Sequence, residues 1–167
     1  MISRIALSAL LALAIASPLS AWAEPLKPVG QAVYKWGFFK IYTAELKAPD
    51  GRFEWRKPFA LSLTYARSLK GASIANASIE EMARLTGRQK SDFEHYRVQL
   101  NLCFPDVSKG DVITGFSTTN NETRFEFNGE TTCLITDPDF KEAFFNIWLA
   151  ENARYSSEAA ALLGRTG

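Results

Sequence analysis

The stretch Arg124-Phe-Glu-Phe-Asn-Gly-Glu-Thr-Thr-Cys-Leu-Ile135 contains the strongest local folding signal in the chain. Before Asn128-Gly129, phenylalanine alternates with charged residues, which is typical of a half-buried strand. Asn-Gly is the favoured pair for a two-residue type I′ turn, because both turn positions adopt positive φ. The sequence therefore predicts an antiparallel β-hairpin over residues 124–135.

A two-residue loop also sets the register of this hairpin. Phe127 is then expected to face Glu130, and Phe125 to face Thr132. Successive strand residues point to opposite faces, so Cys133 is expected on the face opposite Phe125. The residues predicted to share one face are Phe125, Phe127, Thr132 and Leu134.

The residues after the hairpin predict two helices. Asp137-Pro138 combines a capping side chain with proline at the first helical position. Apolar residues follow at helical spacing and widen into a stripe that predicts a helix buried on most sides. Ser156 is expected to start a short last helix that ends at Gly164. The stripe consists of Phe140, Ala143, Phe144, Phe145, Ile147, Trp148 and Leu149.

The residues before the hairpin predict two more helices and a strand. Ser73 can cap a helix that runs to Leu85, and Ser91 can cap a second helix. In the second helix, apolar residues keep helical spacing as far as Cys103, and Phe104-Pro105-Asp106 ends it. Residues 111–118 are expected to form a strand.

The N-terminal part of the domain predicts further strands. Gly37 separates two apolar stretches, residues 31–36 and 38–46, which indicates paired or bent strands. Residues 59–67 alternate at period two, with Phe59, Leu61, Leu63 and Tyr65 on one face. Strands, helices, strands and helices therefore follow one another along the chain. This order predicts an α+β fold with an antiparallel sheet and helices packed mainly on one face.

Residues 1–23 have the three parts of a secretory signal peptide in the expected order. Arg4 gives a positive start, residues 5–15 form an apolar run, and Ala21-Trp22-Ala23 is a small-x-small cleavage site. The apolar run is shorter than the roughly 20 residues that a spanning helix needs. We therefore expect cleavage after Ala23, export to the periplasm or the outside, and a single domain over residues 24–167.

The composition argues against several classes of function. Removal of Arg4 with the signal leaves 18 basic side chains, one fewer than the 19 of the full chain, against 18 acidic ones. Nucleic-acid binders usually carry a basic stripe, so no nucleic-acid partner is expected. No second apolar segment predicts a stable membrane span. No cofactor is expected, and the presence of a single histidine, His95, argues against a His-based metal site and against a Ser-His-Asp triad.

The two cysteines, Cys103 and Cys133, leave two alternatives open. An oxidising compartment favours pairing of two thiols. A bond can form if the helix that ends at Cys103 covers the hairpin face that carries Arg124 and Cys133. Otherwise the two residues lie too far apart. A free-thiol titration under denaturing conditions distinguishes the alternatives.

Six segments of the chain share the features of one known family: residues 30–46, 61–65, 78–82, 104–111, 125–129 and 137–149. Together they resemble the exported bacterial branch of the chalcone isomerase-like family. The resemblance implies an open-faced β-sandwich, in which a large antiparallel sheet and the helices enclose a cleft. In the plant enzyme the cleft binds a flavonoid and closes a ring by adding a phenoxide to an enone. In related plant proteins without that activity, a similar cleft holds a fatty acid.

The resemblance also implies positions for site residues. The enzyme's arginine on the first core strand corresponds to Lys35, which keeps the charge but loses the planar fork. The enzyme's threonine corresponds to Gly37, which has no hydroxyl. Asn76 is the nearest polar amide to the enzyme's helical asparagine, and a small hydroxyl near the last helix corresponds to Ser156 or Ser157. The predicted ligand-binding residues are Lys35, Gly37, Tyr42, Tyr65, Asn76 and Ser157.

Three functions are compatible with this pattern. The first is a non-catalytic binder of a fatty-acid-like or other apolar anion, with Lys35 as the partner of the head group. The second is an intramolecular lyase or isomerase, in which Lys35 stabilises an enolate. The third is a structural or interaction module of the cell envelope, with its cleft filled by side chains. The sequence defines neither the catalytic residues nor the ligand nor the oligomeric state.

Overall fold

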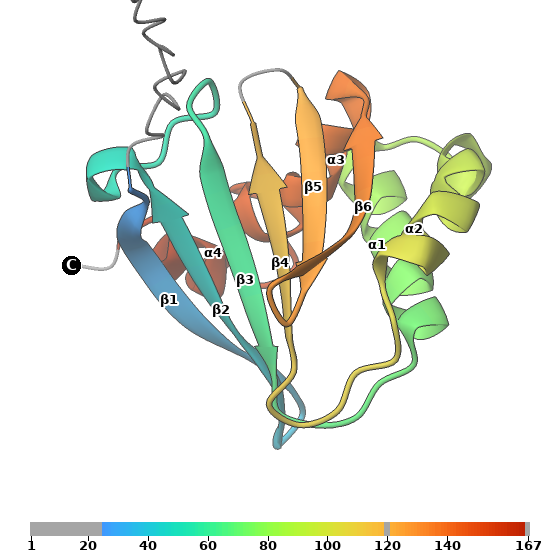
Figure 1. Ribbon diagram of the computed structural model, residues 1–167, viewed down its shortest axis with the longest axis horizontal. Coiled ribbons are helices and arrows are strands. Elements are labelled where there is room, and N and C mark those ends of the chain that lie inside the picture. Colours follow the sequence, from blue (N-terminus) through green and yellow to red (C-terminus); the bar gives the residue numbers. More distant parts are fainter. Residues whose placement is uncertain (1–24, 119–120, 166–167) are drawn as a thin grey trace, which may run out of the picture.

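The computed structural model describes residues 25–118 and 121–165, and it has one antiparallel sheet with its strands in sequence order (Figure 1). The predicted signal peptide lies outside the described residues. The strands are β1 (Lys27–Trp36), β2 (Phe39–Ala48), β3 (Phe59–Tyr65), β4 (Val112–Ser117), β5 (Glu122–Phe127) and β6 (Glu130–Thr136). The helices are α1 (Gly71–Thr86), α2 (Arg97–Cys103), α3 (Pro138–Leu149) and α4 (Ser156–Leu162), with short 3₁₀ helices η1 (Pro49–Gly51) and η2 (Lys90–Tyr96).

The α helices cover one face of the sheet, and the other face carries none of the described helices (Figure 1). α4 packs on β1, α3 contacts β5 and α1, and α2 contacts β6. The predicted α+β fold is therefore confirmed. None of the described helices is long and apolar enough to cross a membrane.

Alternation along the strands places the core between the sheet and the helices. Phe59, Leu61, Leu63 and Tyr65 are all buried on the helix-facing side of β3, as the sequence predicts. The glycine at position 30 permits the close approach of α4. A side chain there would meet the carbonyl oxygen of Ala161 at 2.1 Å, closer than any real contact.

The two helices in the middle of the chain begin at other residues than predicted. α1 begins at Gly71, so Ser73 lies inside its first turn rather than at its cap. Ser91 does not cap the next helix, because Gln89 and Asp92 form a reciprocal capping box before it. That helix starts as the 3₁₀ segment η2 and becomes α-helical only at Arg97.

The β5–β6 hairpin forms where the sequence predicts it, but its register shifts after the first two residue pairs next to the turn. Phe127 pairs with Glu130, as predicted. Phe125 pairs with Cys133, because a β-bulge leaves Thr132 without a cross-strand partner. The Thr132 hydroxyl donates instead to the carbonyl oxygen of Phe125, at 3.3 Å. The prediction that Cys133 points to the other face of the sheet from Phe125 is therefore wrong. As cross-strand partners, both side chains point toward the helices.

The bulge brings the two cysteines together. Cys103, at the end of α2, forms a disulfide with Cys133, and their Cα atoms lie 5.0 Å apart. The Thr132 hydroxyl shares its single proton with the carbonyl oxygen of Cys103, which lies closer, at 2.9 Å. Leu134 was expected beside Phe125, but it is 51% exposed on the sheet face that carries no helix.

The cap of α3 agrees with the prediction. The Asp137 carboxylate accepts the backbone N–H groups of Asp139, at 2.9 Å, and Phe140, at 3.3 Å. Its second oxygen accepts the Tyr96 hydroxyl at 2.6 Å, which ties η2 to the start of α3. These donated hydrogen bonds, that of Tyr96 first, lower the pKa of Asp137.

Candidate ligand-binding cavity

A cavity of about 650 Å³ lies between the helix-facing side of the sheet and helices α1 and α3. Its volume falls in the range of roughly 300–1,000 Å³ that is typical of small-molecule sites. The deep wall consists of buried apolar side chains from the strands, from α3 and from the residue that follows α2. The wall residues are Leu61, Leu63, Phe104, Ile113, Phe125, Phe144, Phe145 and Trp148.

The mouth of the cavity lies along the solvent-exposed side of α1. Ser73, Ala77 and Glu80 of α1 line the cavity and are exposed. Trp36, at the end of β1, lines it from the sheet side and is 75% exposed. The cavity is therefore open to solvent between α1 and the β1–β2 hairpin.

Four tyrosines gather at one end of the cavity. The rings of Tyr34 and Tyr42 stack, with their centroids 4.9 Å apart. Tyr155 meets Tyr34 edge to face at 5.5 Å, and Tyr65 meets Tyr42 at 5.8 Å. All four line the cavity. Cross-strand pairing brings three of them together, because Tyr34 pairs with Tyr42 and Tyr42 pairs with Tyr65, whereas Tyr155 comes from the start of α4.

The Tyr34 hydroxyl is buried without a hydrogen-bond partner among the described residues, and the residue is only 3% exposed. Leaving a buried hydroxyl unpaired is unfavourable, so such groups in a cavity point to a ligand or water. The Tyr42 hydroxyl, by contrast, accepts a hydrogen bond from the Trp148 indole N–H at 3.0 Å.

Burial keeps these hydroxyls protonated. Desolvation raises the pKa of Tyr34, Tyr42 and Tyr65 well above the ordinary value of 10.0. A neutral phenol can donate a hydrogen bond, but it does not act as a base near neutral pH. This end of the cavity is therefore suited to holding an oxygen acceptor.

A cation lies at the rim beside the tyrosines. Arg154 lines the cavity next to Tyr155, and its guanidinium forms an ion pair with Glu81 of α1. Arg84 donates to the same carboxylate at 2.9 Å. Because Glu81 has this second partner, Arg154 can turn toward a bound anion without leaving the carboxylate unpaired.

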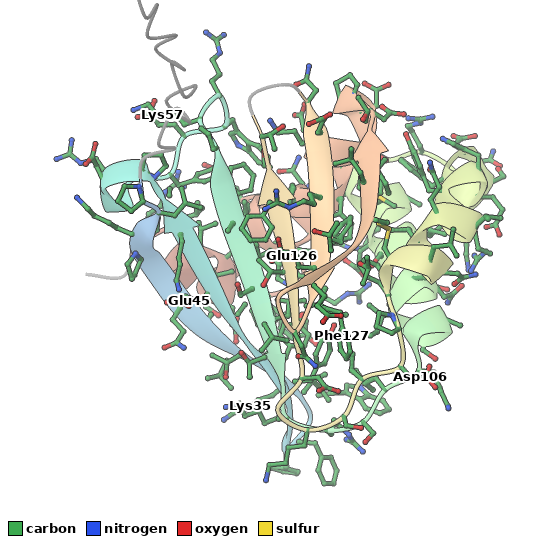
Figure 2. All side chains as sticks on the ribbon, in the orientation of Figure 1. Lys35, Glu45, Lys57, Asp106, Glu126 and Phe127 are labelled. Atoms are coloured by element: carbon green, nitrogen blue, oxygen red, sulfur yellow. A yellow bond between two sulfur atoms is a disulfide. The ribbon has the colours of Figure 1, made fainter. Side chains whose placement is uncertain are left out.

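Two of the six residues predicted from the sequence, Tyr42 and Tyr65, lie in the cavity wall. The other four are not among the lining residues. Lys35 is exposed near the β1–β2 turn, as Figure 2 shows, on the opposite side of the strand from Tyr34. Gly37 forms that turn.

The remaining two predicted residues interact outside the cavity. Asn76 donates to the Glu80 carboxylate at 2.8 Å and accepts from Lys90 at 3.0 Å. Ser157 is exposed in the first turn of α4 and donates to Glu158 at 2.7 Å. Neither side chain is placed to contact a ligand in the wall described above.

Sequence reasoning missed two residues of the site. Tyr34 precedes Lys35, and period-two alternation alone indicates that only one of these neighbours faces the helices. Its pairing with Tyr42 is the signal that identifies it. Arg154 lies between α3 and α4, where no periodic pattern marks a functional residue. Among the described residues, no group of three or more histidine, cysteine, aspartate and glutamate side chains could hold a metal.

The chain belongs to the chalcone isomerase-like family, whose sequence profile it matches over residues 16–164. A protein of Haemophilus influenzae described as uncharacterized is 30% identical over 152 residues, which cover 90% of this chain and 72% of that protein. The crystal structure of a fatty-acid binding protein of Arabidopsis thaliana is similar, with a TM-score of 0.67 and 12% identity. The likeness covers 85% of this chain and 90% of the plant protein, so it shows the shared fold.

Proposed function

We propose that the mature domain is exported and binds a fatty-acid-like or other apolar anionic molecule in the cavity, without catalysis. The observation that carries this proposal is that one cavity has both an apolar wall and the Tyr34 hydroxyl, which has no hydrogen-bond partner among the described residues. The alkyl chain lies along the wall, and a head-group oxygen accepts from Tyr34. Arg154 supplies the opposite charge at the rim, and this assignment replaces Lys35 in that role.

Three facts support binding over catalysis. The plant structure of the same fold is named for fatty-acid binding. Lys35 and Gly37, which match the enzyme's arginine and threonine, lie outside the cavity wall. The cavity tyrosines have raised pKa values, so they are donors rather than bases.

The binding test uses protein that has been stripped of lipid. Residues 24–167 are titrated with palmitate by calorimetry, and lipids extracted from untreated protein are compared with those from an unrelated exported protein. We expect saturable binding of one palmitate and enrichment of fatty acids in the extract. The absence of both would contradict the proposal.

Removal of the Tyr34 hydroxyl tests the assigned donor. A hydrogen bond to a charged group contributes about 1.5–3 kcal/mol, so Tyr34→Phe should weaken palmitate binding about tenfold or more. Tyr96→Phe is the matched control, because the Tyr96 hydroxyl bonds Asp137 and the residue does not line the cavity. Equal affinities of the two variants would show that Tyr34 does not hold the head group.

Export is supported by the signal pattern of residues 1–23 and by the disulfide, since disulfides persist in oxidising compartments. Expression of the full chain in a bacterium and fractionation of the cells test it. We expect the protein in the periplasm or the medium, with Glu24 at its N-terminus. An intact Met1 and a cytoplasmic location would contradict export.

A further inference from the structure

The turn between β1 and β2 carries three exposed aromatic side chains. Trp36 is 75% exposed, Phe38 is fully exposed and Phe39 is 65% exposed. Trp36 pairs with Phe39 across the turn, and Gly37 has a positive φ of 58°. A side chain added at Gly37 would meet nothing within 4 Å, so this turn projects from the body of the protein. Exposed apolar patches mark interaction surfaces.

The charges beside this turn are all positive. Lys35 and Lys40 pair across the two strands, and residues 31–44 contain no other charged side chain. The Arg67 guanidinium lies 5.5 Å from the centre of the Phe39 ring. The turn therefore presents aromatic rings at its tip and three cations around its base.

Two carboxylates in the loop before β4, Asp106 and Asp111, have partners other than the cations of the turn. Asp106 forms an ion pair with Lys70 at 2.6 Å. Asp111 accepts the backbone N–H of Ser108 at 2.7 Å and the side chain of Asn128 at 3.0 Å. Neither carboxylate forms an ion pair with Lys35, Lys40 or Arg67 among the described residues.

The turn is continuous with the mouth of the cavity. Trp36 and Ile41 line the cavity, whereas Phe38 and Phe39 do not. Figure 1 shows the turn at one end of the sheet, beside the loops that follow β3 and precede β4. A surface that bound the tip would therefore lie next to the entrance.

We propose that the tip, residues 35–40, docks on an anionic lipid bilayer, with its aromatic rings in the interface and its cations against the head groups. Tryptophan and phenylalanine favour this depth, and anionic lipids attract nearby lysine and arginine. Docking places the cavity entrance at the membrane, so that the ligand can pass between the bilayer and the cavity. This role in ligand exchange rests on the proposed function.

A bilayer fits this surface better than a folded partner. A stable protein interface buries about 800 Å² on each partner. Three aromatic side chains on a narrow turn offer about 150–250 Å² each, even when fully buried. Insertion of a hydrogen-bonded turn into a lipid interface needs no complementary protein surface. It buries the aromatic rings and at the same time brings the cations against the anionic head groups.

Vesicle binding by residues 24–167 tests the proposal. Partition to vesicles of phosphatidylcholine alone is compared with partition to vesicles that also contain phosphatidylglycerol, by co-sedimentation and by tryptophan fluorescence. We expect stronger binding to the anionic vesicles, with a blue shift of the fluorescence from Trp36. High salt should weaken binding.

Two double variants separate the aromatic and electrostatic contributions. Phe38→Ala with Phe39→Ala should lower partition to anionic vesicles about tenfold or more, through loss of buried apolar area. Lys35→Gln with Lys40→Gln should lower it about fivefold per lysine and leave partition to neutral vesicles unchanged. The matched control removes two exposed apolar side chains elsewhere: Val98→Ala with Leu102→Ala, on α2, should bind as the wild type.

Palmitate binding in solution distinguishes this proposal from the proposed function. The variant without Phe38 and Phe39 should bind palmitate as the wild type does, because neither residue lines the cavity. If the wild type does not bind palmitate, the proposed function is overturned. The docking proposal is then still decided by the vesicle experiments. The docking proposal is overturned if vesicles do not bind, if the aromatic variant binds like its control, or if that variant changes only self-association.

Discussion

The two ends of the space between sheet and helices are both built from aromatic rings, but one is packed and the other is hollow. At the packed end, Phe125, Phe140 and Phe144 contact one another, with Phe140 stacked on Phe144 at 5.3 Å between ring centroids. The Cys103–Cys133 disulfide fixes α2 to the sheet beside them. At the hollow end, four tyrosines surround the cavity.

The difference shows how one core can serve both stability and binding. Phenylalanine rings can fill space on every side, and Phe140 is completely buried. A tyrosine hydroxyl needs a polar partner, and Tyr34 lacks one among the described residues. Phe125 and Phe144 form the boundary, since they contact Phe140 and also line the cavity. The same two rings therefore belong both to the packed core and to the cavity wall.

The largest effect is expected at the packed end. Phe140→Ala should lower the free energy of unfolding by about 3–5 kcal/mol, because it removes a buried ring and leaves a cavity. Chemical denaturation measures this change. Phe38→Ala, at a fully exposed ring, should change it by less than about 0.5 kcal/mol. Similar changes in the free energy of unfolding for the two variants would show that the ring of Phe140 is not tightly packed.

The disulfide should contribute the next largest effect. Its loop spans 30 residues, for which chain entropy gives about 3–4 kcal/mol of stabilisation. Cys103→Ala with Cys133→Ala should lower the free energy of unfolding by about this amount and still bind palmitate. Titration of the denatured wild type should find no free thiols, and two free thiols would show that the bond is absent.

Two tyrosines sharpen the comparison, because the Tyr96 hydroxyl has a hydrogen-bond partner and the Tyr34 hydroxyl has none among the described residues. Tyr96 donates to the Asp137 carboxylate, so Tyr96→Phe should lower the free energy of unfolding by about 1.5 kcal/mol. Tyr34→Phe removes an unpaired buried hydroxyl and should leave stability unchanged or slightly higher in ligand-free protein. A loss of more than about 1 kcal/mol from Tyr34→Phe would indicate a partner for that hydroxyl.

The smallest expected effect is a change in acid stability. The pKa of Asp137 is lowered below its ordinary value of 3.8, mainly by the Tyr96 hydrogen bond. Its stabilising contribution is complete above the ordinary value and is lost as the pH falls through the lowered one. Tyr96→Phe should therefore flatten the acid side of the pH–stability curve. An unchanged slope would assign the shift to the backbone donors instead.

Much of the fold could be predicted because local signals agree with the tertiary structure. The Asn128-Gly129 turn and the Asp137-Pro138 cap act within a few residues, and both lie where they were predicted. The Thr132 bulge could not be predicted, because it depends on the contact of its hydroxyl with Cys103 in α2. This one inserted residue moves Cys133 and Leu134 to the sheet faces opposite those predicted. Cys133 therefore faces the helices and can bond to Cys103.

The site was harder to predict than the fold. Tyr42 and Tyr65 lie in the cavity wall because they are on regular strands, where alternation could be read from the sequence. Lys35 was favoured by its position in the family pattern, but alternation turns it away from the cavity and turns Tyr34 toward it. Arg154 reaches the rim only because α3 and α4 are packed as they are, which no pattern in the sequence records.

We propose that the ligand is held in the cavity, and blocking the entrance tests this most directly. Ala77 is exposed on α1 and lines the mouth, whereas Ala72 is exposed on the same helix and does not line it. Calorimetry should show that Ala77→Trp abolishes palmitate binding, while Ala72→Trp binds like the wild type. Equal binding by both variants would contradict the claim.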